Sequence, residues 1–172
     1  MIGNEQYIKK IYLPKSIFIL NSILFEMVNF LFSIFALIFL GICFGKIQLS
    51  WSLLSIPIVL LFVMILNFGI ASFLSVATVF FRDLIHITPI LTQAAFFATP
   101  ILYSLQLVPV EYHSIMTLNP FFHIVQCFRE PFYSGHLAEP LNYAVLCFGS
   151  IIVFLFGFWV LKRNENRIVF RL

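Results

Sequence analysis

Four long runs of apolar residues dominate the chain, and short polar stretches separate them. The runs cover residues 17–44, 53–80, 85–105 and 142–161. Because about 20 apolar residues in a helix cross a hydrocarbon core about 30 Å thick, each run predicts one transmembrane helix. Pro89 and Pro100 lie in the third run, where we expect a kink. The predicted fold class is therefore all-α, a polytopic helical bundle with four spans.

Composition supports a membrane protein. Hydrophobic residues make up 62% of the 172 residues and charged residues 10%, and the mean hydropathy is +1.04. A soluble domain of this length has too small a core to hide so much apolar surface, whereas a bilayer solvates it. The sequence therefore argues against a soluble domain.

The basic residues set the orientation, because cytoplasmic flanks carry the excess of Lys and Arg. If the N-terminus is cytoplasmic, eight of the ten basic residues lie on the cytoplasmic side, and only Lys46 and Arg129 lie outside. The eight are Lys9, Lys10, Lys15, Arg82, Lys162, Arg163, Arg167 and Arg171. We predict a multi-pass protein of the bacterial inner membrane with both termini in the cytoplasm. The net charge of +3 then reports topology, and no nucleic-acid partner is expected.

Two segments outside the spans have patterns of their own. Residues 1–16 precede the first span, and within them Tyr7 to Lys15 alternates apolar and basic positions around Pro14, which predicts an interfacial helix, or else a charged anchor that fixes topology. Residues 106–140 form a long outer segment. Its composition predicts two short helices, about 112–118 and 121–132, broken at Asn119-Pro120 and lying as re-entrant or interfacial helices.

Polar residues within the spans are candidates for function. Glu26 and Asn29 lie one helical turn apart on one face of the first span. They either line a pore or link to a gate, or Glu26 lies at the cytoplasmic headgroup level. In the outer segment, Arg129 either pairs locally with Glu130 or stands at a pore mouth and attracts anionic groups.

Residues that would carry catalysis or bind a metal are not arranged for it. The four histidines do not have metal-ligand spacing, and the three cysteines are widely separated and read as small apolar residues. Gly41 and Gly45 are spaced for a close contact between helices rather than for a phosphate loop, which needs a longer spacing and a Ser or Thr after its Lys. We therefore predict no enzyme activity, no cofactor and no metal.

Four short motifs, in order, resemble one known family. They are Tyr7-Ile8-Lys9-Lys10-Ile11-Tyr12-Leu13-Pro14, Phe81-Arg82-Asp83-Leu84, Thr99-Pro100-Ile101-Leu102-Tyr103 and Leu118-Asn119-Pro120-Phe121. The chain resembles, over nearly its whole length, the permeases of type-2 ABC exporters that move polysaccharides and polyol phosphates such as O-antigen, capsule and teichoic acid. It resembles only the later four spans of that pattern, so the family's N-terminal spans are expected to be missing.

The resemblance implies roles for individual residues. Lys9, Lys10, Tyr12 and Pro14 would couple to a separate ATPase subunit, and Arg82 and Asp83 would stabilise a cytoplasmic turn. Residues of an outer gate, some of which could contact the glycan, would be Tyr103, Asn119, Pro120, Phe121, Phe122, Arg129 and Tyr133. The implied protein is a homodimer in membrane lipid that exports a glycan or glycolipid. The alternatives are a permease of this type for a drug or small lipid-like molecule, and a membrane scaffold without transport activity.

Overall fold

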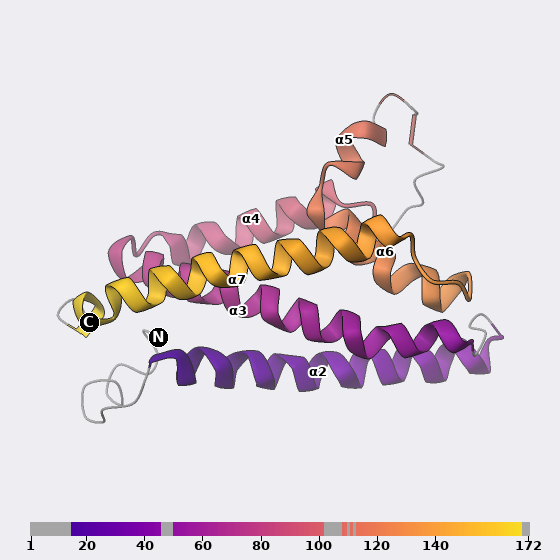
Figure 1. Cartoon of the computed structure of the whole chain (residues 1–172), viewed down its shortest axis with the longest axis horizontal. Coiled ribbons are helices and arrows are strands. Elements are labelled where there is room, and N and C mark those ends of the chain that lie inside the picture. Colours follow the sequence, from indigo (N-terminus) through magenta and orange to yellow (C-terminus); the bar gives the residue numbers. More distant parts are fainter. Residues whose placement is uncertain (1–14, 46–49, 102–107, 110, 112, 170–172) are drawn as a thin grey trace.

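The computed structural model describes residues 15–45, 50–101, 108–109, 111 and 113–169, and every regular element among them is a helix. Among these described residues, three helices are long and apolar enough to cross a membrane. They are α2 (Lys15–Cys43), α3 (Ile56–Phe80), which the short 3-10 helix η2 (Trp51–Ser55) precedes, and α7 (Pro140–Val169). They lie side by side along the bundle (Figure 1). The predicted all-α membrane bundle is confirmed.

The third predicted span is shorter than expected. Helix α4 covers only Leu84–Ala98, and its 15 residues rise about 22 Å, less than the roughly 30 Å hydrocarbon core. The helix ends because Thr99 precedes a proline, which disfavours the helical conformation; Thr99 has φ −104° and ψ 132°. Residues 102–107, which complete the predicted run, lie outside the described residues. None of the residues of α4 is buried.

Helices α3 and α7 form the tightest pair of the bundle, and a glycine on each makes this possible. A Cβ atom on Gly69 would lie 2.5 Å from the carbonyl oxygen of Val153, and one on Gly157 would overlap the carbonyl group of Gly69. The small-residue contact predicted at Gly41 and Gly45 is wrong. Helix α2 ends at Cys43, and Gly45 has a φ of +63°, in the left-handed conformation common just after a helix.

The segment between α4 and α7 contains two short helices on either side of Asn119, as the sequence predicts. These are α5 (His113–Thr117) and α6 (Pro120–Tyr133). Helix α6 packs its apolar side against α3 and α7. Phe132 meets Ile56 and Leu60, and Cys127 lies between Val59 and Leu146. Helix α6 is therefore part of the packed bundle.

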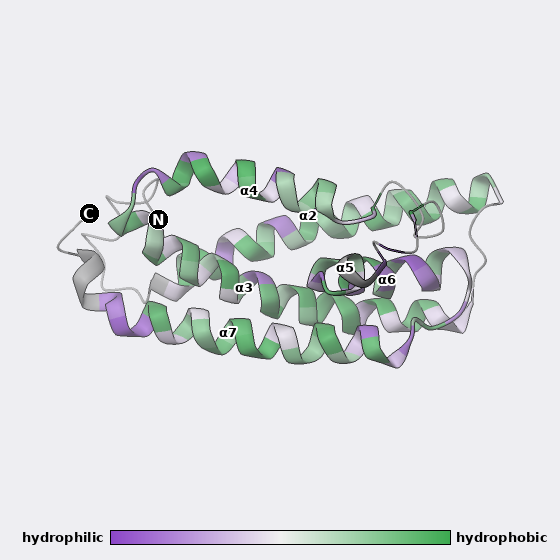
Figure 2. Ribbon diagram, turned by 90° about the horizontal axis from the view of Figure 1, so that it is seen from above, coloured by the Kyte–Doolittle hydropathy of each residue, from purple (hydrophilic) through white to green (hydrophobic). Residues whose placement is uncertain are grey.

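The ends of the bundle differ in composition. Helix α2 begins, α7 ends and the α3–α4 turn lies at one end, whereas α5 and α6 lie towards the other (Figure 1). Figure 2 shows hydrophobic residues along the long helices, with hydrophilic residues mainly at their ends and on α6. Near the end of α7, the Arg163 guanidinium lies over the Trp159 ring at 5.1 Å, a pair suited to the membrane interface.

Candidate functional site

Asn119 starts helix α6 and also binds the end of α4. Its side-chain oxygen accepts a hydrogen bond from the Phe121 amide at 3.0 Å, the usual bond of an N-cap residue, and Pro120 follows at the first helical position. Its side-chain nitrogen donates to the Thr99 hydroxyl at 3.1 Å and to the Ala98 carbonyl at 3.4 Å. One side chain therefore fixes both the start of α6 and its position against α4.

Arg129 makes the second link between the same two helices. Its Nη2 donates to the carbonyl oxygens of Pro100 at 3.0 Å and Ile101 at 2.7 Å. Carbonyl groups at a helix C-terminus lack partners within the helix, and a positive charge there is favourable. We call these contacts of Asn119 and Arg129 with residues 98–101 the α4 clamp. The sequence suggested an ion pair or a pore-mouth charge for Arg129, and this bonding to backbone was in neither interpretation.

Substituting Arg129 by Gln is expected to loosen the α4 clamp. The change removes a charged donor from two carbonyl oxygens, and hydrogen bonds to charged groups contribute about 1.5–3 kcal/mol. We expect the thermal unfolding temperature in detergent to fall accordingly. It should fall less for Arg129→Lys, which keeps the positive charge but lacks the planar guanidinium group. Glu130→Gln, next in the chain, is the matched control. Equal stability of Arg129→Gln and Glu130→Gln would contradict the clamp.

The predicted gate aromatics are not in equivalent positions. Phe121 is 43% exposed and Tyr133 71% exposed, but they lie 12 residues apart at opposite ends of α6. Phe122 is only 6% exposed and packs edge-on against the His123 ring, so its ring is part of the core. Tyr103 lies outside the described residues. Contact of Phe121 and Tyr133 with a glycan stays a prediction.

His123 is a buried residue that the sequence did not single out. Its Nε2–H donates to the Thr117 carbonyl at 2.8 Å, and its Nδ1 lies 2.6 Å from the side-chain oxygen Oδ1 of Asn142. A carbonyl oxygen only accepts, so a proton is on Nε2, and Nδ1 forms the second hydrogen bond with the Asn142 side chain. The ring thus joins α5, α6 and the start of α7. A single buried histidine has no spacing signal that could have revealed this.

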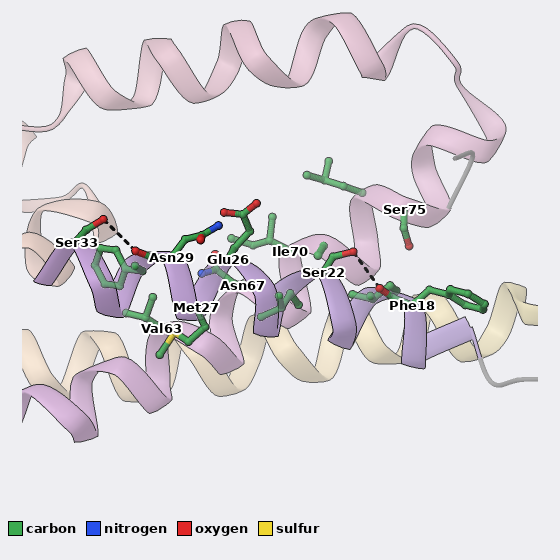
Figure 3. Close-up of a pocket in the computed structure, with 15 residues that line it drawn as sticks. Phe18, Ser22, Glu26, Met27, Asn29, Ser33, Val63, Asn67, Ile70 and Ser75 are labelled. Carbon is green, nitrogen blue, oxygen red and sulfur yellow. Dashed lines mark hydrogen bonds between the residues drawn. The ribbon is translucent and has the colours of Figure 1, made fainter. Parts of the chain in front are cut away.

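Glu26 and Asn29 lie in a groove between α2 and α3 that does not include the residues of the α4 clamp (Figure 3). The groove encloses about 750 Å³. Figure 3 shows both side chains near Asn67 of α3, with Ser22 and Ser33 on either side along α2. The structure therefore adds Ser22, Ser33 and Asn67 to the two polar residues that the sequence identified.

The remaining predicted residues lie just before the start of helix α4 or outside the described residues. Arg82 and Asp83 form the exposed turn between α3 and α4, where the Leu84 amide donates to the Phe81 carbonyl and the His86 amide to the Asp83 carbonyl. Asp83 has the N-cap position of α4 but no side-chain capping bond. The coupling residues Lys9, Lys10, Tyr12 and Pro14 lie outside the described residues, so both roles stay predictions.

These features define a multi-pass helical membrane protein in which the short helix α6 is tied into the bundle. Residues 3–133 match the family described as ABC-2 type transporter. The chain belongs to this family, and the resemblance seen in its motifs is confirmed.

Named relatives agree with the family. The chain is 34% identical over 170 residues to an O-antigen export system permease protein RfbA of Klebsiella pneumoniae, covering 96% of this chain and 64% of the relative. It is 31% identical over 136 residues to RfbA of Myxococcus xanthus, 77% of this chain and 52% of the relative. It is 26% identical over 123 residues to the polysialic acid transport protein KpsM of Escherichia coli, which covers 72% of this chain and 44% of the relative. The chain thus spans less than two thirds of the length of these relatives.

Proposed function

We propose that this chain belongs to the membrane-spanning permease subunit of an ABC exporter that moves a polysaccharide or lipid-linked glycan out of the cytoplasm. The observation that carries the proposal is the 34% identity to an O-antigen export permease over 96% of this chain. The polysialic acid transport protein among the relatives supports a glycan substrate over a drug. The permease supplies the path, and a separate ATPase subunit supplies the energy.

The geometry supports a route by which the ATPase moves the outer end. In this proposal two copies form the conduit, and the ATPases push on the cytoplasmic segments around residues 9–14 and 82–83. Helix α4 starts at that turn and is bound to α6 by Asn119 and Arg129 at its other end. A shift of α4 therefore moves α6, and the outer helices of the two copies separate as the glycan passes.

Coupling to the ATPase is tested by charge reversal at the N-terminal segment. Lys9→Glu together with Lys10→Glu is expected to weaken the detergent-solubilised complex with the cognate ATPase at least about tenfold, or 1.4 kcal/mol. Lys162→Glu with Arg163→Glu is the matched control, since this pair of basic residues is at the end of α7. Unchanged binding of the first variant in a quantitative pull-down would remove the coupling role.

Orientation is tested by labelling from the two sides of the membrane. Leu118 is 86% exposed beside α6, so a Leu118→Cys thiol is expected to react with a membrane-impermeant reagent added outside the cell. Phe122→Cys is the control, because the Phe122 side chain is buried and its replacement should react from neither side. Labelling of Leu118→Cys from the cytoplasm alone would invert the proposed topology.

A further inference from the structure

The groove between α2 and α3 has one polar wall, made by a stripe along α2. Ser22, Glu26, Asn29 and Ser33 recur at steps of four, three and four residues, which places them on one helix face. All four line the groove, and Asn67 and Ser75 face them from α3. We call the four α2 residues the polar stripe.

The polar stripe has unused hydrogen-bonding capacity. Ser22 and Ser33 donate to the carbonyls of Phe18 and Asn29 of their own helix, at 3.1 and 3.0 Å, so their oxygens can still accept. Within the described part of the chain, the side chains of Glu26, Asn29 and Asn67 have no hydrogen-bond partner. Such groups are costly against lipid and belong in a protein interior or beside water. The stripe therefore marks a face that lipid does not cover.

The groove has the size and lining of a ligand site. Its volume of about 750 Å³ falls within the roughly 300–1,000 Å³ of sites that hold drug-sized molecules. Mostly apolar walls with a few hydroxyl, amide and carboxylate groups are typical of such sites. A short stretch of glycan fits this volume, and its hydroxyl groups can both donate to Glu26 and Asn29 and accept from Asn67.

The charge of the groove limits which glycans fit. Its lining residues include the carboxyl group of Glu26 but no Lys, Arg or His. The carboxylate attracts cations and repels anions, and low-dielectric walls strengthen both effects. A polymer with a negative charge on each sugar would meet this repulsion at every step, whereas a neutral polymer would not.

We propose that the groove along the polar stripe guides the exported glycan through the cytoplasmic half of the membrane and favours uncharged over polyanionic polymers. This rests on the proposed export function and on the proposed orientation, which places Ser22 and Glu26 in the inner half of α2, Asn29 at its midpoint and Ser33 one turn beyond. The remaining turns of α2, from Ile34 to Cys43, carry apolar side chains apart from the terminal cysteine. The selective region is therefore short, and Glu26 lies within it.

A thiol introduced into the polar stripe tests both the water access and the charge. Asn29→Cys is made with Cys43 and Cys147 replaced by Ser, and Cys127 is kept. Burial raises the pKa of the Cys127 thiol to about 11, which leaves it unreactive near neutral pH. Cationic and anionic methanethiosulfonates are added to the membrane-inserted protein. We expect the Asn29→Cys thiol to react about tenfold faster with the cationic reagent, after each rate is divided by the rate of that reagent with a small thiol in solution.

Two variants separate the possible results. Adding Glu26→Gln should bring the two rates together, and Leu31→Cys, on the opposite face of α2 and 46% exposed to the surroundings of the helix, should react with neither reagent. No reaction at Asn29→Cys would show that protein covers the stripe. Equal rates with Glu26 intact would show that the groove does not select by charge. Either result overturns the proposal.

An export assay distinguishes this inference from the proposed function. With the cognate ATPase, the chain should export an uncharged glycan at least tenfold faster than a polyanionic one, and Glu26→Lys should reduce that ratio. Export of both at equal rates would refute selection by the groove and leave the export function intact. Export of neither, with the expected labelling, would refute the export function and leave a water-filled acidic groove.

Discussion

Gly157→Ala is expected to destabilise the bundle by about 3 kcal/mol or more, although it adds one methyl group. The new Cβ would lie 2.7 Å from the carbonyl carbon of Gly69 and closer still to its oxygen, and real Cβ atoms essentially never approach within 3.0 Å. Overpacking against side chains costs about 1–3 kcal/mol, and here the obstacle is backbone that cannot change rotamer. Helices α3 and α7 would have to move apart along their whole contact.

The same substitution elsewhere provides the controls. Gly69→Ala should cost as much, because its Cβ meets the backbone of Val153 and Phe154 at 2.5–2.6 Å. Gly149→Ala, also on α7, has nothing within 4 Å of the new Cβ, and the higher helix propensity of Ala should leave it unchanged or slightly stabilised. Thermal unfolding in detergent measures all three. A Gly157→Ala protein as stable as Gly149→Ala would show that the helices are not so close.

His123→Phe is expected to destabilise the protein by about 2–4 kcal/mol. The replacement keeps a ring of similar size but leaves the Thr117 carbonyl and the Asn142 amide without this partner in a buried site, and each such loss costs about 1–3 kcal/mol. The destabilisation should concentrate where α5, α6 and α7 meet. Hydrogen exchange of the α6 amides, together with thermal unfolding, measures it.

His136→Phe is the matched control for this prediction, because His136 is exposed in the turn before α7. It should change stability by less than about 0.5 kcal/mol. A double-mutant cycle with Asn142→Leu isolates the contact between the two side chains, since residues that bond each other are not additive. Additive losses would mean that His123 acts through packing and not through this hydrogen bond.

Much of the fold follows from the apolar pattern. Runs of about 20 or more apolar residues need a helix in lipid, and α2, α3 and α7 are close to the predicted ranges. The break at Asn119-Pro120 was also predictable, because both residues favour the start of a helix. The length of α4 was predicted wrongly. The apolar run continues to Leu105, and Pro100 was interpreted as a kink within a span, whereas the residue before this proline ends the helix.

The close α3–α7 contact was hidden because it depends on two distant residues. Gly69 and Gly157 form no short motif, whereas the spacing of Gly41 and Gly45 suggested a helix contact although Gly45 lies beyond the end of α2. A single glycine in an apolar helix gives no indication of which helix approaches it. Only the three-dimensional arrangement pairs the two.

The candidate site was predictable in part for the same reason. Charged and amide residues within a span are rare, which identified Glu26 and Asn29. Ser22, Ser33 and Asn67 carry weaker signals, since serine is common in membrane helices and Asn67 belongs to another span. Arg129 was selected as a charged outer residue, but its bonds to the backbone after α4 require the fold.

The partners of the α4 clamp affect how freely this region can change in sequence. Arg129 binds the carbonyl oxygens of residues 100 and 101, and Asn119 binds that of residue 98. Every amino acid has this oxygen, so substitutions at these three positions remove no acceptor provided that the chain keeps its path. Mutational tolerance is thus unequal: positions 98, 100 and 101 can change, whereas Thr99, whose hydroxyl accepts from Asn119, and the two donor side chains must be kept.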